Sequence, residues 1–90
     1  MTNYIGIVHK DDGSDFSLAF PDFPGCVTAG RDLPELKRMA EEALAFHIEG
    51  MLEDGERIPE PSSLEAVMLD PDNRDGVPIL VPLRSLALAQ

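Results

Sequence analysis

The chain has 90 residues, of which 43% are hydrophobic and 27% charged, so it can form one small hydrophobic core. Seventeen acidic residues against seven basic ones give a formal net charge of -10. Such a surface repels phosphate backbones and anionic membranes, so we expect no direct nucleic-acid or membrane binding. The charge favours a basic protein partner, although it also fits a role in solubility alone.

Targeting and redox signals are few in this sequence. Residues 1–8 lack the basic start and the long apolar run of a signal peptide. No stretch approaches the ~20 apolar residues of a membrane span. The single cysteine, Cys26, cannot form an internal disulfide. We therefore expect a cytoplasmic protein with a single domain over residues 1–90, and its small core favours a homo-oligomer, most simply a dimer.

Three short strands are predicted in the first third of the chain, over residues 4–8, 16–20 and 26–29. The first is apolar or small on both faces, which is typical of a central strand. An Asp-Gly turn links it to the second, where Phe16, Leu18 and Phe20 alternate with smaller residues. A loop stiffened by two prolines, residues 21–25, leads to the third.

One long helix is predicted from Leu33 to about Asp54. Asp32 can cap its first turn, which tolerates Pro34, and Gly55 can end it. Apolar or inward-facing residues recur at helical spacing on the face expected to pack on the sheet, namely Leu33, Leu36, Ala40, Ala43, Leu44, His47 and Met51. Ile48 and Leu52 are assigned to an outer flank.

The last part of the chain is predicted to return to the sheet. Residues 57–63 are proline-rich and extended, residues 63–69 form a short helix capped by Ser62 or Ser63, and residues 71–76 form a loop. Residues 77–83 form the last strand. Pro78 and Pro82 share a parity, so they remove backbone donors from the same side, which only an edge strand accepts.

These elements predict an α+β fold of order β-β-β-α-(α)-β. Three hairpin-ordered strands and a returning fourth give a four-stranded sheet in the spatial order 3-2-1-4, with the one main helix packed on one face. We expect the helix to connect the third strand to a fourth strand parallel to it, by a right-handed crossover.

Few residues suggest catalysis. Asp11, Asp12 and Asp15 lie in or beside the hairpin turn, where aspartate is common for local reasons, although such acids could also hold a metal ion. Cys26 and His47 could form a nucleophile and base, but no third group supports them. We therefore expect no enzyme activity, no catalytic residue, no metal site and no cofactor.

A partner-binding surface is more strongly indicated. Glu42, Glu49 and Glu53 fall on the outer helix face beside Phe46, and the proline-stiffened loop adds Asp22 and Phe23. The alternatives are a merely solvated helix face and a Phe23 ring tucked into the core. The oligomer contact is expected at the edge strand, at Val77, Ile79 and Val81.

Two proline-punctuated junctions bracket the helix, and the chain from about Tyr4 to Leu83 resembles the HicB-like antitoxin family. The matching residues are Phe20, Asp22, Pro24, Gly25, Cys26, Thr28 and Gly30, then Ala40, Glu42, Ala43 and Leu44, then Gly55, Ile58, Pro59 and Pro61. The resemblance implies a partial ribonuclease-H-like fold without a nuclease site. It also implies a partner, a small basic HicA-type toxin that cleaves mRNA and is blocked by binding.

The sequence departs from many such antitoxins at its end. Only residues 84–90 follow the last predicted strand, too few for a ribbon-helix-helix or helix-turn-helix, so we expect no separate DNA-binding domain in residues 1–90. The resemblance favours an antitoxin-like binding protein. An orphan regulatory or ligand-binding module of the same fold, and a metal-dependent nuclease or hydrolase, remain the alternative functions.

Overall fold

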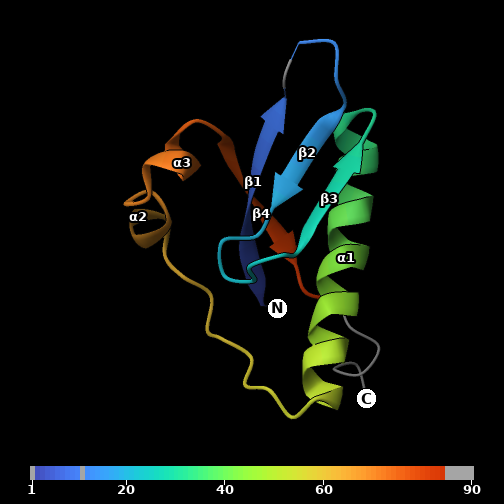
Figure 1. Cartoon of the computed structure of the whole chain (residues 1–90), viewed down its shortest axis with the longest axis vertical. Coiled ribbons are helices and arrows are strands. Elements are labelled where there is room, and N and C mark those ends of the chain that lie inside the picture. The colour runs from blue at the N-terminus through green and yellow to red at the C-terminus, as the bar shows by residue number, and fades with distance from the viewer. Residues whose placement is uncertain (1, 11, 85–90) are drawn as a thin grey trace.

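A computed structural model describes residues 2–10 and 12–84 and shows one sheet with a long helix against it (Figure 1). The elements are β1 (Asn3–Lys10), β2 (Phe16–Ala19), β3 (Val27–Gly30), α1 (Leu33–Glu53), α2 (Leu64–Val67), α3 (Pro71–Arg74) and β4 (Val77–Pro82). The four strands lie in the order β3-β2-β1-β4, and every neighbouring pair is antiparallel. The predicted α+β class and strand order are confirmed.

Strand β1 is central and buried on both faces, as its sequence predicts. Tyr4 and Val8 pack into the main core beneath α1. Ile5 and Ile7 point to the opposite face, where Val67 of α2 covers them. The sheet therefore has a large core on the α1 side and a smaller one under α2.

Helix α1 contributes one row of buried residues to the main core. Asp32 caps its N-terminus by accepting a hydrogen bond from the Glu35 N–H at 2.8 Å, and Gly55 follows its end with a φ of 74°. The fully buried residues recur every fourth position, at Leu36, Ala40, Leu44 and Ile48. The placement of Ile48 on an outer flank is thus wrong, and Leu33 is half exposed, because the packed stripe follows the i, i+4 row toward Ile48.

The direction of β4 differs from the prediction. It pairs antiparallel with β1, and β1 is parallel to β3 through their shared neighbour β2, so β4 runs opposite to β3. Figure 1 shows the reason, since residues 54–63 carry the chain back from the end of α1 to the α2–α3 end of the sheet. The crossover is therefore a helix plus a return segment. Part of the predicted loop over residues 71–76 is the short helix α3.

Strand β4 lies at the edge of the sheet, as its prolines predict. The Leu83 N–H donates to the Thr2 carbonyl at 2.8 Å, so residues 77, 79, 81 and 83 direct their backbone groups toward β1. The backbone groups of Pro78, Leu80 and Pro82 point away from β1, toward the open edge of the sheet. Both prolines face the open edge, where no ladder donor is needed. Within the described part of the chain, no helix is long and apolar enough to cross a membrane.

Candidate functional site

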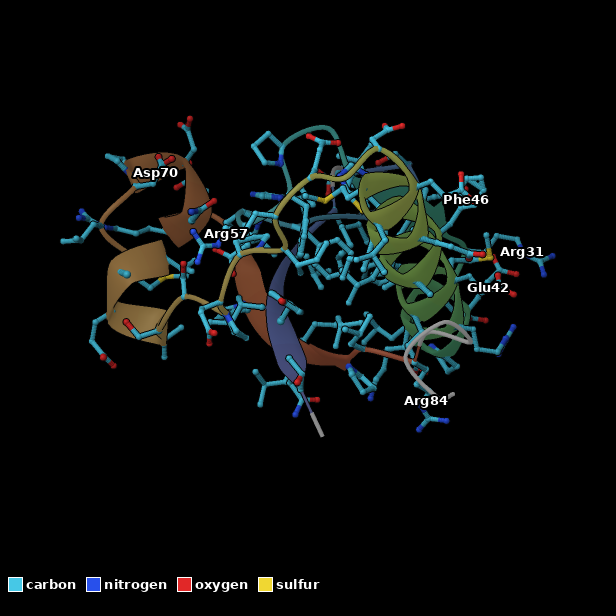
Figure 2. The ribbon with its side chains drawn as sticks, turned by 90° about the horizontal axis from the view of Figure 1, so that it is seen from below. Arg31, Glu42, Phe46, Arg57, Asp70 and Arg84 are labelled. Carbon is cyan, nitrogen blue, oxygen red and sulfur yellow. The ribbon has the colours of Figure 1, made fainter. Side chains whose placement is uncertain are left out.

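The outer face of α1 carries an acidic surface around one exposed aromatic ring. Glu42, Glu49 and Glu53 are exposed on this helix, and the Phe46 ring between them is 74% exposed. Figure 2 shows Glu42 and Phe46 on the side of α1 that faces away from the sheet. These four predicted residues therefore lie on one helix face. We call them the α1 surface.

The charges on α1 are compensated unevenly. Near its start, Glu35 accepts hydrogen bonds from Arg31, with a 2.9 Å ion pair, and this guanidinium lowers the pKa of Glu35. Glu41 pairs with Arg84 at 3.0 Å. Glu42, Glu49 and Glu53 form no ion pair with any residue in the described ranges. The uncompensated negative charge therefore gathers toward the C-terminal half of the helix.

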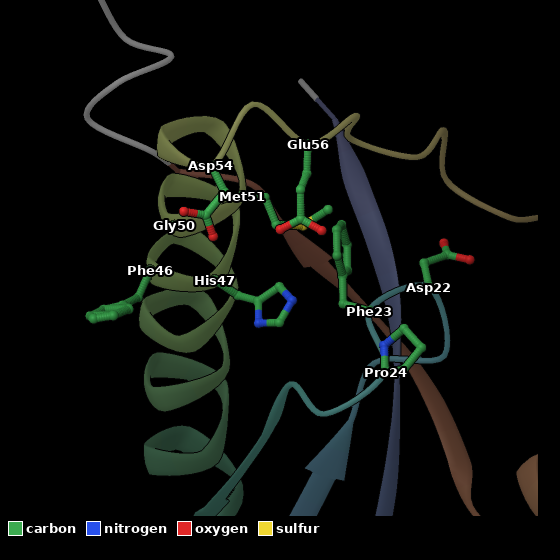
Figure 3. Close-up of a pocket in the computed structure, with 9 residues that line it drawn as sticks. All are labelled: Asp22, Phe23, Pro24, Phe46, His47, Gly50, Met51, Asp54 and Glu56. Carbon is green, nitrogen blue, oxygen red and sulfur yellow. The ribbon is translucent and has the colours of Figure 1, made fainter.

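Beside the α1 surface, a hollow of about 510 Å³ separates the helix from the loop of residues 21–25. In the close-up of Figure 3, His47 points from α1 toward Phe23, and Glu56 turns its carboxylate into the space between them. Met51 and Gly50 contribute the helix wall. The hollow thus combines an apolar base with carboxylates at its rim, Asp54 and Glu56.

The two loop residues predicted to bind a partner both make contacts within the fold. Phe23 is only 2% exposed and packs edge-on against Tyr4 and His47, with ring centroids 4.8 and 5.6 Å away. Its ring is a core residue and not an exposed anchor. Asp22 accepts hydrogen bonds from the Ser62 N–H at 2.9 Å and from the Ser62 hydroxyl at 2.5 Å. Both residues hold the loop in place beside the hollow.

The three residues of β4 predicted at the oligomer contact differ in their exposure to solvent. Val77 is 62% exposed and Ile79 is partly buried, but Val81 is 2% exposed and packs in the main core. Val81 is therefore not available as a surface contact. Leu80, which the sequence reading did not select, is 63% exposed on the opposite face of the same strand. The exposed apolar side chains of β4 are Val77 and Leu80.

The candidate catalytic groups lie in different environments, with the cysteine buried and the hairpin aspartates exposed. Cys26 is buried, its thiol donates to the Ala43 carbonyl at 3.7 Å, and burial raises its pKa, which disfavours the nucleophilic thiolate. Asp12 and Asp15 are exposed at the hairpin, while Asp11 lies outside the described residues. Across residues 2–10 and 12–84, no three His, Cys, Asp or Glu side chains are grouped so as to hold a metal ion.

The comparisons with known proteins identify the family. The model for the HicB_like antitoxin of bacterial toxin-antitoxin systems matches residues 4–90. This chain belongs to that HicB-like antitoxin family. It is 41% identical over 77 residues to an uncharacterized 14.9 kDa protein from the rep-hol intergenic region of Haemophilus phage HP1. That alignment covers 86% of this chain and 56% of the phage protein.

Solved HicB structures share the fold. The crystal structure of the Burkholderia pseudomallei antitoxin HicB matches with a TM-score of 0.81 and 31% identity, over 92% of this chain and 64% of that one. A chain of the HicA3 and HicB3 toxin-antitoxin complex matches with a TM-score of 0.75 and 29% identity, over 92% of this HicB-like chain and 99% of that one. The chain thus spans 56% and 64% of the phage and Burkholderia relatives.

Among the residues that line the hollow, Gly50, Asp54 and Glu56 had no role in the sequence-based prediction of the partner-binding surface. All three line the hollow beside the α1 surface. Asp54 and Glu56 follow the helix, where nothing in a periodicity pattern assigns them to a surface. Gly50 carried a usable signal, since a glycine inside a helix weakens it and calls for a reason elsewhere.

Proposed function

We propose that this chain is a HicB-like antitoxin that binds a small basic HicA-type toxin and neutralises it. The observation that carries the proposal is the likeness to a chain of the HicA3 and HicB3 toxin-antitoxin complex, which extends over 92% of this chain. The net charge of -10 supports a basic partner, because opposite charges raise the rate of encounter.

The contact that we propose for the toxin is the α1 surface of Glu42, Phe46, Glu49 and Glu53. Its carboxylates are exposed and unpaired by basic neighbours within the described residues. Phe46 adds an apolar ring of the kind that is often buried at the centre of an interface. Asp22 and Phe23 act in this scheme by fixing the adjacent loop and not by direct contact.

The proposed action is binding and not catalysis. A nucleophilic cysteine requires a lowered pKa, whereas burial raises the pKa of Cys26. A toxin is neutralised by occupying its surface, which needs no reactive group in the antitoxin. The raised pKa argues against a cysteine-dependent hydrolase, while a ribonuclease assay with added metal ions tests the alternative of a metal-dependent nuclease or hydrolase.

We further propose that the chain forms a homodimer near the β4 edge. Val77 and Leu80 leave apolar side chains exposed there, and a domain of 90 residues gains stability from covering them. Because both prolines face outward, this contact uses side-chain packing and not an extended ladder.

The experiment that tests the proposed function is to search beside the gene for a short basic reading frame and to co-express its product with this chain. We expect the two products to co-purify, and we expect growth arrest by the basic product to be relieved when this chain is present. An adjacent product that neither binds the purified chain nor is relieved by it would contradict the antitoxin function. An orphan regulatory or ligand-binding module would then be the better description.

A further inference from the structure

The C-terminal half of α1 departs from ordinary helix chemistry in several ways within nine residues. The Phe46 ring is 74% exposed, although large apolar rings are normally covered. Glu49 and Glu53 are like charges at i, i+4, which repel each other. The last turn has no basic residue to oppose the negative end of the helix dipole. Departures that gather in this way are expected at functional sites.

Gly50 adds a fourth departure, and nothing in the described fold explains it. A Cβ built at Gly50 meets no atom within 4 Å, so close packing does not require glycine there. Its φ is not positive, unlike the φ of Gly13, Gly25 and Gly55. Glycine inside a helix is less favourable than alanine. Neither close packing nor backbone conformation therefore requires glycine at position 50.

Gly50 lies where two hollows meet on the surface of α1. One is the 510 Å³ hollow toward His47 and Met51, and the other is a hollow of about 150 Å³ lined by Phe46, Glu49, Gly50 and Glu53. Both are lined by Phe46 and Gly50. Figure 3 shows Phe46 pointing away from α1 and from the His47 side of the helix. We call the two hollows together the Gly50 groove, and a side chain at position 50 would stand between them.

We propose that Gly50 keeps this groove open for an arginine side chain of the toxin, which lies against the Phe46 ring between Glu49 and Glu53. The inference rests on the proposed function and makes Gly50 a residue that determines partner specificity. It identifies the partner by chemistry, as a basic protein that presents an arginine on a protruding surface.

Arginine fits this groove better than other side chains. Its planar guanidinium stacks on an aromatic face and can also donate to carboxylates in its plane. The two unpaired glutamates provide acceptors on the same side of the helix as the exposed ring. Arg38 and Arg84 line a neighbouring hollow that also includes Phe46 and Glu49. Neither arginine lines the two hollows that Gly50 lines, so the Gly50 end of the groove is acidic.

The first test compares Gly50→Ala and Gly50→Gln with Leu52→Gln. Leu52 is exposed on the same helix but lines neither hollow, so it receives the same side chain as a matched control. We expect Gly50→Ala to raise the melting temperature by about 4 °C or more, since alanine favours the helix. We expect Gly50→Gln to weaken toxin binding by about tenfold or more, and Leu52→Gln to leave it within about twofold.

The second test addresses the identity of the inserted side chain. Phe46→Leu keeps an apolar side chain but removes the ring face that attracts a cation. We expect it to weaken toxin binding by about three- to tenfold, and mainly by faster dissociation. Binding by Phe46→Leu as tight as that of the unaltered chain would overturn the arginine assignment.

The outcomes separate this inference from the function on which it rests. The probe is the product of the short basic reading frame sought beside the gene, with affinities measured by calorimetry and folding by thermal melts. If the unaltered chain does not bind the toxin, both the proposed function and this inference are contradicted. If the unaltered chain binds and Gly50→Gln binds equally well, the inference alone is overturned.

Discussion

Asp22 and Ser62, 40 residues apart in the sequence, are joined by two hydrogen bonds from the serine N–H and hydroxyl to the aspartate carboxylate. This pair ties the loop before β3 to the return segment after α1. The Tyr4 hydroxyl donates to the Pro59 carbonyl at 2.6 Å and fixes the same segment to β1. Of these residues, Asp22 also lines the hollow beside the α1 surface.

Removal of the Asp22 carboxylate should destabilise the fold. We expect Asp22→Ala to lower the free energy of unfolding by about 1–3 kcal/mol, because the partly buried Ser62 N–H loses a charged acceptor. Ser62→Ala should cost less, about 1 kcal/mol, since its N–H remains bonded. Urea melts of both single variants and the double variant measure the coupling, and Asp12→Asn in the exposed hairpin is the control. Additive single losses would show that the two residues do not act as a unit.

Charge reversal on the α1 surface should slow association with the toxin. Changing Glu42, Glu49 and Glu53 to lysine removes the field that steers a basic partner, while exposed charges contribute little to stability. The rate of association of the unaltered chain should also fall as salt shortens the screening length from ~10 Å at 0.1 M to ~3 Å at 1 M. Stopped-flow kinetics with parallel thermal melts measures both effects. Unchanged association in the triple variant would exclude α1 as the steering surface.

The purified chain should have no ribonuclease activity of its own. The described residues contain no grouped ligands for the divalent ions that such nucleases use. We expect labelled RNA to remain intact with magnesium or manganese. Asp11→Asn together with Asp15→Asn is the control, because cleavage that disappears in that double variant would establish a metal-dependent site at the hairpin.

Burial of Cys26 predicts a loss of stability at alkaline pH. Its pKa is raised in the folded state from an ordinary value of 9.0. The stabilisation is therefore complete below about pH 9 and is lost as the pH rises toward the folded value. Urea melts at pH 7, 9 and 10 measure the free energy of unfolding, which should fall less with rising pH in Cys26→Ala than in the unaltered chain. Tyr4, whose pKa is also raised by burial, contributes a similar decline at higher pH in both proteins.

The proposed dimer should be sensitive to the exposed side chains of β4. We expect sedimentation equilibrium at tens of micromolar to give a dimer, and Val77→Asp with Leu80→Asp to give a monomer. Val27→Asp is the control, because Val27 is exposed on β3, the edge strand on the other side of the sheet. A monomeric unaltered chain at that concentration would rule the dimer out.

Much of this fold is predictable because its signals are local. The alternation of Phe16, Leu18 and Phe20, the cap at Asp32 and the parity of Pro78 and Pro82 each report on neighbouring backbone. The reversed direction of β4 was not predictable in this way. It depends on the path of residues 54–63, which is fixed by contacts such as those of Tyr4 and Asp22 with distant residues.

The candidate site was likewise predictable where the signal is local and not where it depends on distant contacts. The helix period correctly brought Glu42, Phe46, Glu49 and Glu53 to one exposed face. It did not decide whether Phe23 would be exposed, since a loop ring has no period, and the structure buries it against Tyr4 and His47. The likeness to HicB antitoxins came from spaced prolines and glycines, which mark turns that the fold requires.

The outward prolines of β4 have a consequence for how the protein behaves when it accumulates. An unprotected edge strand is a template on which further copies can add, and this is a common route to aggregation. Three residues of β4, Pro78, Leu80 and Pro82, direct their backbone groups toward the open edge, and only Leu80 has an N–H there. The carbonyl groups of an incoming strand would therefore find few backbone donors on β4. The β4 edge thus resists open-ended polymerisation while it still presents side chains for a closed contact.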